Sequence, residues 1–158
     1  MHSQEDILKK TSILIDKKNY EEAKSILLEL IKDIKNIKID VRVYYSLYLS
    51  FNGLKEIKSA KKYLEKYLKN NNNNHIALNN LANIYLKERN FFKAEKFYLK
   101  SLESKNDYLI AIINTAVFYQ DIGKIAEAKK FYLRAIDLSP KQISLYFNLS
   151  RIDKNFMN

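Results

Sequence analysis

NTAVFYQDIGKIAEAKKFYLRAIDLSP, residues 114–140, carries the clearest structural pattern in the chain. The small Ala116 and the aromatic Tyr119 lie three residues apart, which places both on one face of a helix. Gly123 follows in a short polar stretch that predicts a turn, and a second apolar helical pattern comes after it. Pro140 cannot continue that second helix. The stretch therefore predicts two helices joined by a tight turn.

The same pattern recurs with a period of 34 residues. Ala60, Ala94 and Ala128 are separated by 34 and 34 positions, and each is followed four residues later by a large apolar side chain. An earlier copy is centred on Ala23, 37 positions before Ala60, and its three extra residues fall in the Lys- and Ile-rich connection 33–40. A fixed period of this length with helical patterning in both halves is typical of an α-solenoid, in which helix pairs stack in a row.

The expected fold is all-α, with about four helix-turn-helix repeats and a C-terminal helix. The helices are predicted at 4–16, 20–33, 40–53, 57–69, 75–88, 91–104, 108–121, 125–137 and about 142–156. The repeats are predicted at about 4–37, 41–74, 75–108 and 109–142, followed by the terminal helix 142–156. The asparagine run 70–74 occupies the connection between two repeats, so we interpret it as a turn. We therefore expect a single domain, 1–158.

The third and fourth repeats closely resemble the tetratricopeptide repeat family. The family pattern is followed by Leu78, Leu81, Ala82, Tyr85, Ala94, Tyr98 and Leu102, and again by Ala116, Tyr119, Gly123, Ala128, Tyr132, Ala135 and Pro140. The second repeat, with Tyr44, Leu47, Phe51, Ala60, Leu64 and Leu68, departs from the pattern where Tyr48 replaces the small residue. The resemblance implies a superhelix whose concave wall is made by the first helix of each pair.

Several functional classes are excluded by composition. The chain has no cysteine, which excludes disulfides, thiolate zinc sites and a catalytic cysteine. Its two glycines and one proline argue against a glycine-rich phosphate loop. His2 and His75 lie far apart in the sequence, and no grouping of Ser, His and Asp suits nucleophilic catalysis. We therefore expect no enzyme activity, no cofactor and no metal.

The net charge is 28 − 18 = +10, which raises the question of nucleic acid or an anionic membrane as partner. The cationic residues are 24 Lys and only 4 Arg. Because Arg is the residue that contacts phosphates and bases bidentately, nucleic acid is not the expected partner. The apolar, uncharged stretch 108–120 has 13 residues, too few to span a membrane, and Glu5 and Asp6 do not suit a secretory signal. We expect a cytoplasmic protein without a membrane span.

Three asparagines form a ladder in the predicted concave wall. Asn80, Asn114 and Asn148 are spaced 34 and 34 residues apart and so occupy the same place in successive repeats. A carboxamide both donates and accepts hydrogen bonds, which suits the backbone of an extended peptide. The alternative is that these amides bond to a neighbouring helix or to water. The predicted peptide-binding residues are Asn79, Asn80, Asn83, Asn114, Val117, Phe147, Asn148 and Arg151, with Tyr45, Ser46, Leu49, Ile76, Ile110 and Ile113 as further residues of the groove.

The resemblance also bears on the kind of peptide. One family variant grips the acidic C-terminal tails of chaperones with a clamp of Lys, Asn and Arg. Asn83 and Asn114 match its asparagine positions, but Asn79, Ser144 and Asn148 stand where its cations belong. The resemblance therefore does not imply binding of chaperone tails.

The predicted ninth helix is apolar around most of its circumference. It carries Leu145, Tyr146, Phe147, Leu149, Ile152 and Phe156. A terminal helix of a solenoid is expected to be polar outside, so something covers it: further repeats, a catalytic domain or a second copy of the chain. The leading function is a scaffold that binds a peptide segment of another protein. The alternatives are an RNA-binding helical-repeat protein, or the N-terminal interaction module of a larger enzyme such as a transferase.

Overall fold

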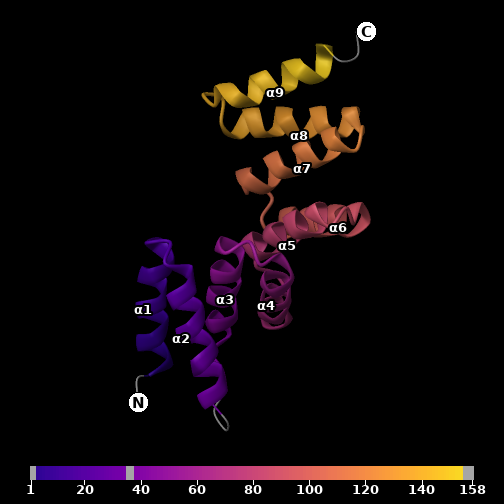
Figure 1. The fold of residues 1–158 in the computed structure, drawn as a ribbon. Helices are drawn as coiled ribbons and strands as arrows, with labels where there is room; N and C mark the ends of the chain where they lie inside the picture. The colour runs from indigo at the N-terminus through magenta and orange to yellow at the C-terminus, as the bar shows by residue number, and fades with distance from the viewer. Residues whose placement is uncertain (1–2, 35–37, 155–158) are drawn as a thin grey trace. The chain divides into compact units, whose positions relative to one another are not determined.

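A computed structural model describes residues 3–34 and 38–154, and this part of the chain forms α-helices and no strands (Figure 1). The helices are α1 (Gln4–Asp16), α2 (Tyr20–Asp33), α3 (Val41–Gly53), α4 (Ile57–Asn70), α5 (His75–Lys87), α6 (Phe91–Ser104), α7 (Leu109–Asp121), α8 (Ile125–Leu138) and α9 (Ile143–Lys154). The predicted all-α class, with four helix pairs and a terminal helix, is confirmed. The side chain of Phe156, the last turn predicted for the ninth helix and His2 lie outside the described residues.

The helices group into two compact units, Met1–Asn72 and Asn73–Asn158. In the first unit α1 pairs with α2, α3 packs on both, and α4 pairs with α3. In the second unit α5 pairs with α6, α7 packs on both, α8 pairs with α7, and α9 packs on α8. Each unit therefore repeats one step, in which a single helix lies on the pair before it. One domain over the whole chain stays a prediction.

Small residues mark the close approach of paired helices, as the 34-residue period predicts. Ala23, Ala60, Ala94 and Ala128 are each fully buried. The large residues four positions later are also in the core: Leu27, Leu64, Tyr98 and Tyr132. In α3, Tyr48 stands in place of a small residue and is nevertheless buried, with its ring 5.5 Å from that of Tyr45. The departure of the second repeat from the pattern is therefore accommodated inside the packing.

Each helix pair turns through one residue in the left-handed region. These residues are Lys18 (φ 61°), Lys55 (φ 62°), Arg89 (φ 58°) and Gly123 (φ 76°). The next N–H in each turn donates to a carbonyl oxygen five residues earlier, at 2.8 to 2.9 Å: Asn19 to Leu14, Glu56 to Phe51, Asn90 to Tyr85 and Lys124 to Tyr119. This is the Schellman geometry that commonly ends helices. Only the fourth repeat has glycine at this left-handed position. The glycine content of the sequence therefore does not reveal the turns of the other three repeats.

Serine, aspartate and asparagine side chains cap the N-termini of several helices. Ser3 and Asp6 form a capping box at the start of α1, and Asp40 accepts from the N–H of Arg42 at the start of α3. Asn74 and Asn90 accept from N–H groups in the first turns of α5 and α6. Such caps satisfy backbone donors that have no partner within the helix.

None of the helices in the described parts of the chain is long and apolar enough to cross a membrane. This agrees with the short uncharged stretches in the sequence. A cytoplasmic location stays a prediction.

Candidate functional site

The second unit holds the predicted asparagine ladder on α5, α7 and α9. Asn80, Asn114 and Asn148 are all half-buried, one on each helix. Val117 is half-buried one turn after Asn114, and Arg151 is exposed one turn after Asn148. The structure therefore leaves part of each ladder residue accessible, which a contact with a ligand requires.

Asn79 has a different environment from the ladder. Its side chain is 2% exposed, and its Oδ1 accepts a hydrogen bond of 3.0 Å from Nδ2 of Asn114. A buried carboxamide needs such a partner, because an unsatisfied polar group in the interior is costly. We predicted that Asn79 faces the groove, but the structure places it inside the packing between α5 and α7. There it fixes the orientation of the Asn114 amide.

Asn83 is held by the second helix of its own repeat. The hydroxyl of Tyr98 on α6 donates to Oδ1 of Asn83 at 2.5 Å. Burial of the phenol, together with the negative charge of Asp121, raises the pKa of Tyr98 to about 12. The hydroxyl is therefore protonated at neutral pH and remains a donor. Asn83 is half-buried and can still donate through its own N–H groups.

Phe147 lies on a different side of α9 than we expected. Leu145 and Ile152 are buried, whereas Phe147 is 62% exposed. At 100° per residue, Phe147 points away from both of these residues. Phe147 comes 68 positions after Asn79, which is two periods of 34, so the two residues are equivalent in α9 and α5. In α5 this position is covered by α7. Phe147 therefore faces outward at the end of the second unit. The sequence had predicted that it faces the groove.

The predicted groove residues of the second repeat line a hollow in the first unit. Tyr45, Ser46 and Leu49 border a pocket of about 380 Å³, a size suited to one or two side chains of a ligand. The remaining lining residues are Glu5, Leu8, Lys9, Ser12, Arg42 and Tyr67. The pocket joins α1 and α3, the first helices of two successive repeats. Apart from Tyr67 of α4, all its lining residues come from these two first helices.

Two interactions organise this hollow. The ring of Tyr45 lies 4.9 Å from that of Tyr67. The Arg42 guanidinium bonds to Asp40 at 2.6 Å and to Glu5 at 2.7 Å, linking α3 to α1. Hydrogen bonds from Arg42 hold the pKa of the Asp40 carboxyl below its ordinary value. Arg42 and Glu5 were not among the predicted groove residues, because nothing in the repeat period marks them.

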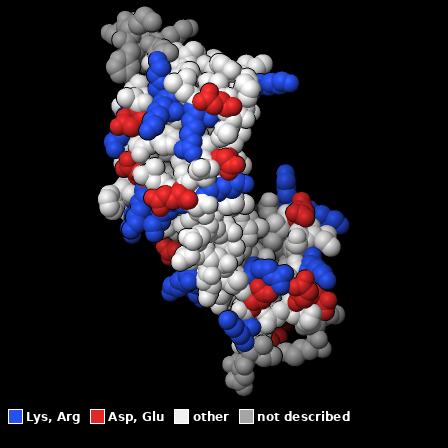
Figure 2. Space-filling view, turned by 180° about the vertical axis from the view of Figure 1, so that it is seen from behind, with Lys and Arg blue, Asp and Glu red and all other residues white. Residues whose placement is uncertain are grey.

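Lysines in the described residues are interspersed with acids. Figure 2 shows Lys and Arg beside Asp and Glu over the face in view, without a continuous field of one sign. Lys24 bonds to Glu21 at 2.7 Å and to Glu56 at 3.0 Å, and Lys124 lies 3.3 Å from Glu95. Within the described residues no three His, Asp or Glu side chains gather in a way that could hold a metal ion.

Comparisons with known proteins agree with this architecture. The family model for the tetratricopeptide repeat matches residues 76–108 and 111–142. No curated protein matches the sequence.

Several solved structures share the fold at low sequence identity. PilF of Pseudomonas aeruginosa is 17% identical, with a TM-score of 0.80 over 98% of this chain and 69% of that one. A double mutant of MamA from RS-1 is 18% identical, with a TM-score of 0.83 over 98% of this chain and 86% of that one. YrrB, described as a TPR protein with an unusual peptide-binding site, is 20% identical, with a TM-score of 0.77 over 87% of this chain and 70% of that one.

The two matched segments correspond to α5–α6 and α7–α8, the repeats whose residues follow the family pattern most fully. The similarity of fold extends over nearly the whole chain. Residues 76–108 and 111–142 are therefore tetratricopeptide repeats, and the chain has the fold of these solved structures.

Proposed function

We propose that this protein is a non-enzymatic scaffold that binds an extended segment of a partner protein through Asn80, Asn114 and Asn148. The proposal rests mainly on the hydrogen bonding of the Asn114 side-chain amide. One of its N–H groups is committed to Asn79 at 3.0 Å, which fixes the plane of the carboxamide. Its second N–H and its oxygen suit the C=O and N–H of a peptide backbone.

A fixed amide favours binding because less side-chain freedom is lost when the ligand arrives. The link to buried Asn79 supplies this at Asn114, and the bond from Tyr98 does the same for Asn83. Val117, one turn beyond Asn114, adds a partly exposed apolar surface for a side chain of the ligand. Backbone recognition by amides and apolar contact at intervals together suit an extended peptide.

The expected affinity is modest. Each amide hydrogen bond contributes about 0.5 to 1.5 kcal/mol net. Together with apolar contacts, this corresponds to a dissociation constant in the micromolar range, or about −8 kcal/mol. The YrrB structure, described as having a peptide-binding site, supports peptide binding by a related fold, although a shared fold alone does not imply a shared function.

The test is selection of peptides from a random display library with the full chain, followed by calorimetry on the selected sequences. The variant Asn80→Ala/Asn114→Ala/Asn148→Ala is expected to weaken binding by about tenfold or more, because three backbone contacts are lost. A matched control replaces three exposed amides elsewhere, Asn52→Ala/Asn72→Ala/Asn73→Ala. Equal affinity of both variants for the selected peptides would contradict the proposal.

RNA is the competing ligand, because the chain carries a net charge of +10. Titration with single-stranded RNA at several salt concentrations separates the two, since release of counterions from phosphates gives a steep dependence on salt. Peptide binding through neutral amides is expected to change little with salt. Tight, steeply salt-dependent RNA binding that the asparagine variant retains would replace the peptide proposal.

A further inference from the structure

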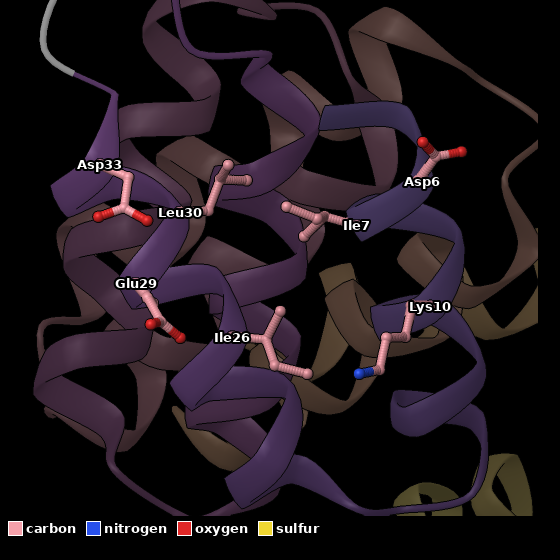
Figure 3. Close-up of a pocket in the computed structure, with 7 residues that line it drawn as sticks. All are labelled: Asp6, Ile7, Lys10, Ile26, Glu29, Leu30 and Asp33. Carbon is pink, nitrogen blue, oxygen red and sulfur yellow. The ribbon is translucent and has the colours of Figure 1, made fainter. Parts of the chain in front are cut away.

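The first unit has a second hollow, formed by α1 and α2 (Figure 3), with a volume of about 570 Å³. Its floor is apolar and its rim is charged. The floor consists of Ile7, Ile26 and Leu30, and the rim of Asp6, Lys10, Glu29 and Asp33. In Figure 3, Ile7 of α1 points toward the apolar side chains of α2, while the carboxylates of Glu29 and Asp33 lie along one side. We call this hollow the α1–α2 pocket.

The α1–α2 pocket lies on the side of the pair that is turned away from α3 and α4. Glu5 of α1 pairs with Arg42 of α3, and Lys24 of α2 pairs with Glu56 before α4. At 100° per residue, Ile7 points away from the side of Glu5, and Ile26 points away from the side of Lys24. The pocket is therefore separate from the hollow that contains Tyr45.

The charge of the α1–α2 pocket is opposite to that of the whole chain. Three carboxylates and one lysine give it 1 − 3 = −2, whereas the chain carries +10. Glu29 and Asp33 are four residues apart at the C-terminal end of α2, and within the described residues neither carboxylate forms an ion pair. Like charges at this spacing repel each other, and the helix dipole disfavours negative charge at that end. An apolar helix that carries a cation would fill the pocket and relieve both effects.

Helix α9 has this chemistry. Ile143 is 82% exposed, Phe147 is 62% exposed and Tyr146 is 45% exposed. Arg151 is exposed one turn after Phe147. A single helix lying on a helix pair is also the packing step that this chain uses, since α3 lies on α1 and α2, and α7 lies on α5 and α6.

We propose that α9 of one copy docks in the α1–α2 pocket of a second copy, with Phe147 on the apolar floor and Arg151 beside Glu29 and Asp33. The two surfaces are different, so the contact is heterologous and joins copies head to tail. It uses neither the asparagine ladder nor the hollow that contains Tyr45. Association of copies is therefore independent of the proposed peptide binding.

The test is analytical ultracentrifugation of the full chain over a range of concentrations. The wild type is expected to grow in mass with concentration beyond the dimer unless the chain of copies closes into a ring. The α9 variant Phe147→Ser/Arg151→Glu and the pocket variant Glu29→Lys/Asp33→Lys each lose one surface. Each is expected to raise the dissociation constant by about tenfold or more. All four residues are exposed, so the fold should remain intact, which circular dichroism checks.

Mixing the two variants gives the sharpest result. Each retains one good surface of a different kind, so an equal mixture is expected to form dimers that grow no further. Matched controls place the same substitutions elsewhere on exposed residues, Phe92→Ser and Glu103→Lys/Asp107→Lys, and are expected to associate as the wild type does. The asparagine-ladder variant should also associate normally, whatever its effect on peptides.

Three results would overturn the proposal. The first is a wild type that stays monomeric at every concentration, which would leave the α1–α2 pocket for a basic helix of another protein. The second is association that neither variant weakens. The third is growth of the variant mixture beyond dimers.

Discussion

The Asn114 side-chain nitrogen lies 3.0 Å from the Asn79 side-chain oxygen and joins α7 to α5 by a hydrogen bond between equivalent helices of successive repeats. The residues one and two periods after Asn79 are Ile113 and Phe147, neither of which has a polar side chain. The link therefore occurs once in the second unit. It gives the packing of α7 on α5 a polar contact within a largely apolar core.

Replacing Asn79 by alanine is expected to lower the free energy of unfolding by about 1 to 3 kcal/mol, because the hydrogen bond is lost and a buried site is left underfilled. Urea denaturation of the full chain measures the change. A double-mutant cycle with Asn114→Ala isolates the contribution of the pair. Additive effects of the two substitutions would show that the amides do not stabilise each other.

Enlarging the small residues at the helix contacts is expected to destabilise the protein. Ala94 and Ala128 have no exposed surface, so Ala94→Leu or Ala128→Leu should cost about 1 to 3 kcal/mol through overpacking. Ala126, on the exposed side of α8, provides a matched control because Ala126→Leu adds the same atoms without crowding. Thermal melts compare the three variants. Equal melting temperatures would contradict the register of the repeats.

Left-handed turn residues offer a route to higher stability. Arg89 has φ 58° in the turn where the fourth repeat has Gly123. Because this conformation is strained for residues with a side chain, Arg89→Gly is expected to stabilise the protein by about 0.5 to 1 kcal/mol after the entropy cost of glycine.

The reverse substitution is the control for this prediction. A methyl group at position 123 would meet no atom within 4 Å, so Gly123→Ala tests the backbone conformation alone and is expected to destabilise. Urea denaturation measures both variants. If both substitutions changed the free energy of unfolding in the same direction, backbone strain in the turns would not explain their effects.

Stability is expected to fall at alkaline pH, in part because Tyr98 must ionise. Burial raises the pKa of Tyr98 to about 12 in the folded chain, against about 10 when exposed. A raised pKa means that the stabilisation is complete below about pH 10 and is lost as the pH rises toward 12. The difference corresponds to about 2 to 3 kcal/mol at most.

Denaturation at a series of alkaline pH values measures this loss. Tyr98→Phe is expected to flatten the decline, because the phenol is gone. Asn83→Ala removes the acceptor of the phenol but keeps the ionising group, so it should retain most of the decline. A decline that Tyr98→Phe leaves unchanged would assign the alkaline loss to other groups.

Much of the fold follows from the period of 34 residues. Helix bounds and the burial of Ala60, Ala94 and Ala128 depend on local patterns that repeat, and the sequence predicted them correctly. Contacts between residues that are not equivalent in the repeat could not be predicted from the period. The clearest case is Gly53, where an added Cβ would meet the ring of Tyr20 at 2.5 Å. Nothing in the repeat period marks this position, which the structure uses for close packing of Tyr20 against α3.

The candidate site was predictable to a similar extent. The ladder positions of Asn80, Asn114 and Asn148 follow from the period, and all three side chains are partly accessible. The burial of Asn79 and the outward direction of Phe147 depend on which helix packs on each face, and periodicity alone does not contain that information. The α1–α2 pocket was missed for the same reason.

Within each unit, the closely packed helices are neighbours in the sequence or are separated by one helix. Such an arrangement has low contact order, so little chain entropy is lost before favourable contacts form. Each helix pair is a hairpin that closes over a turn of a few residues and then serves as a template for the next. We therefore expect the protein to fold quickly and stepwise. A helix pair that forms early makes its contacts without residues from the distant end of the chain.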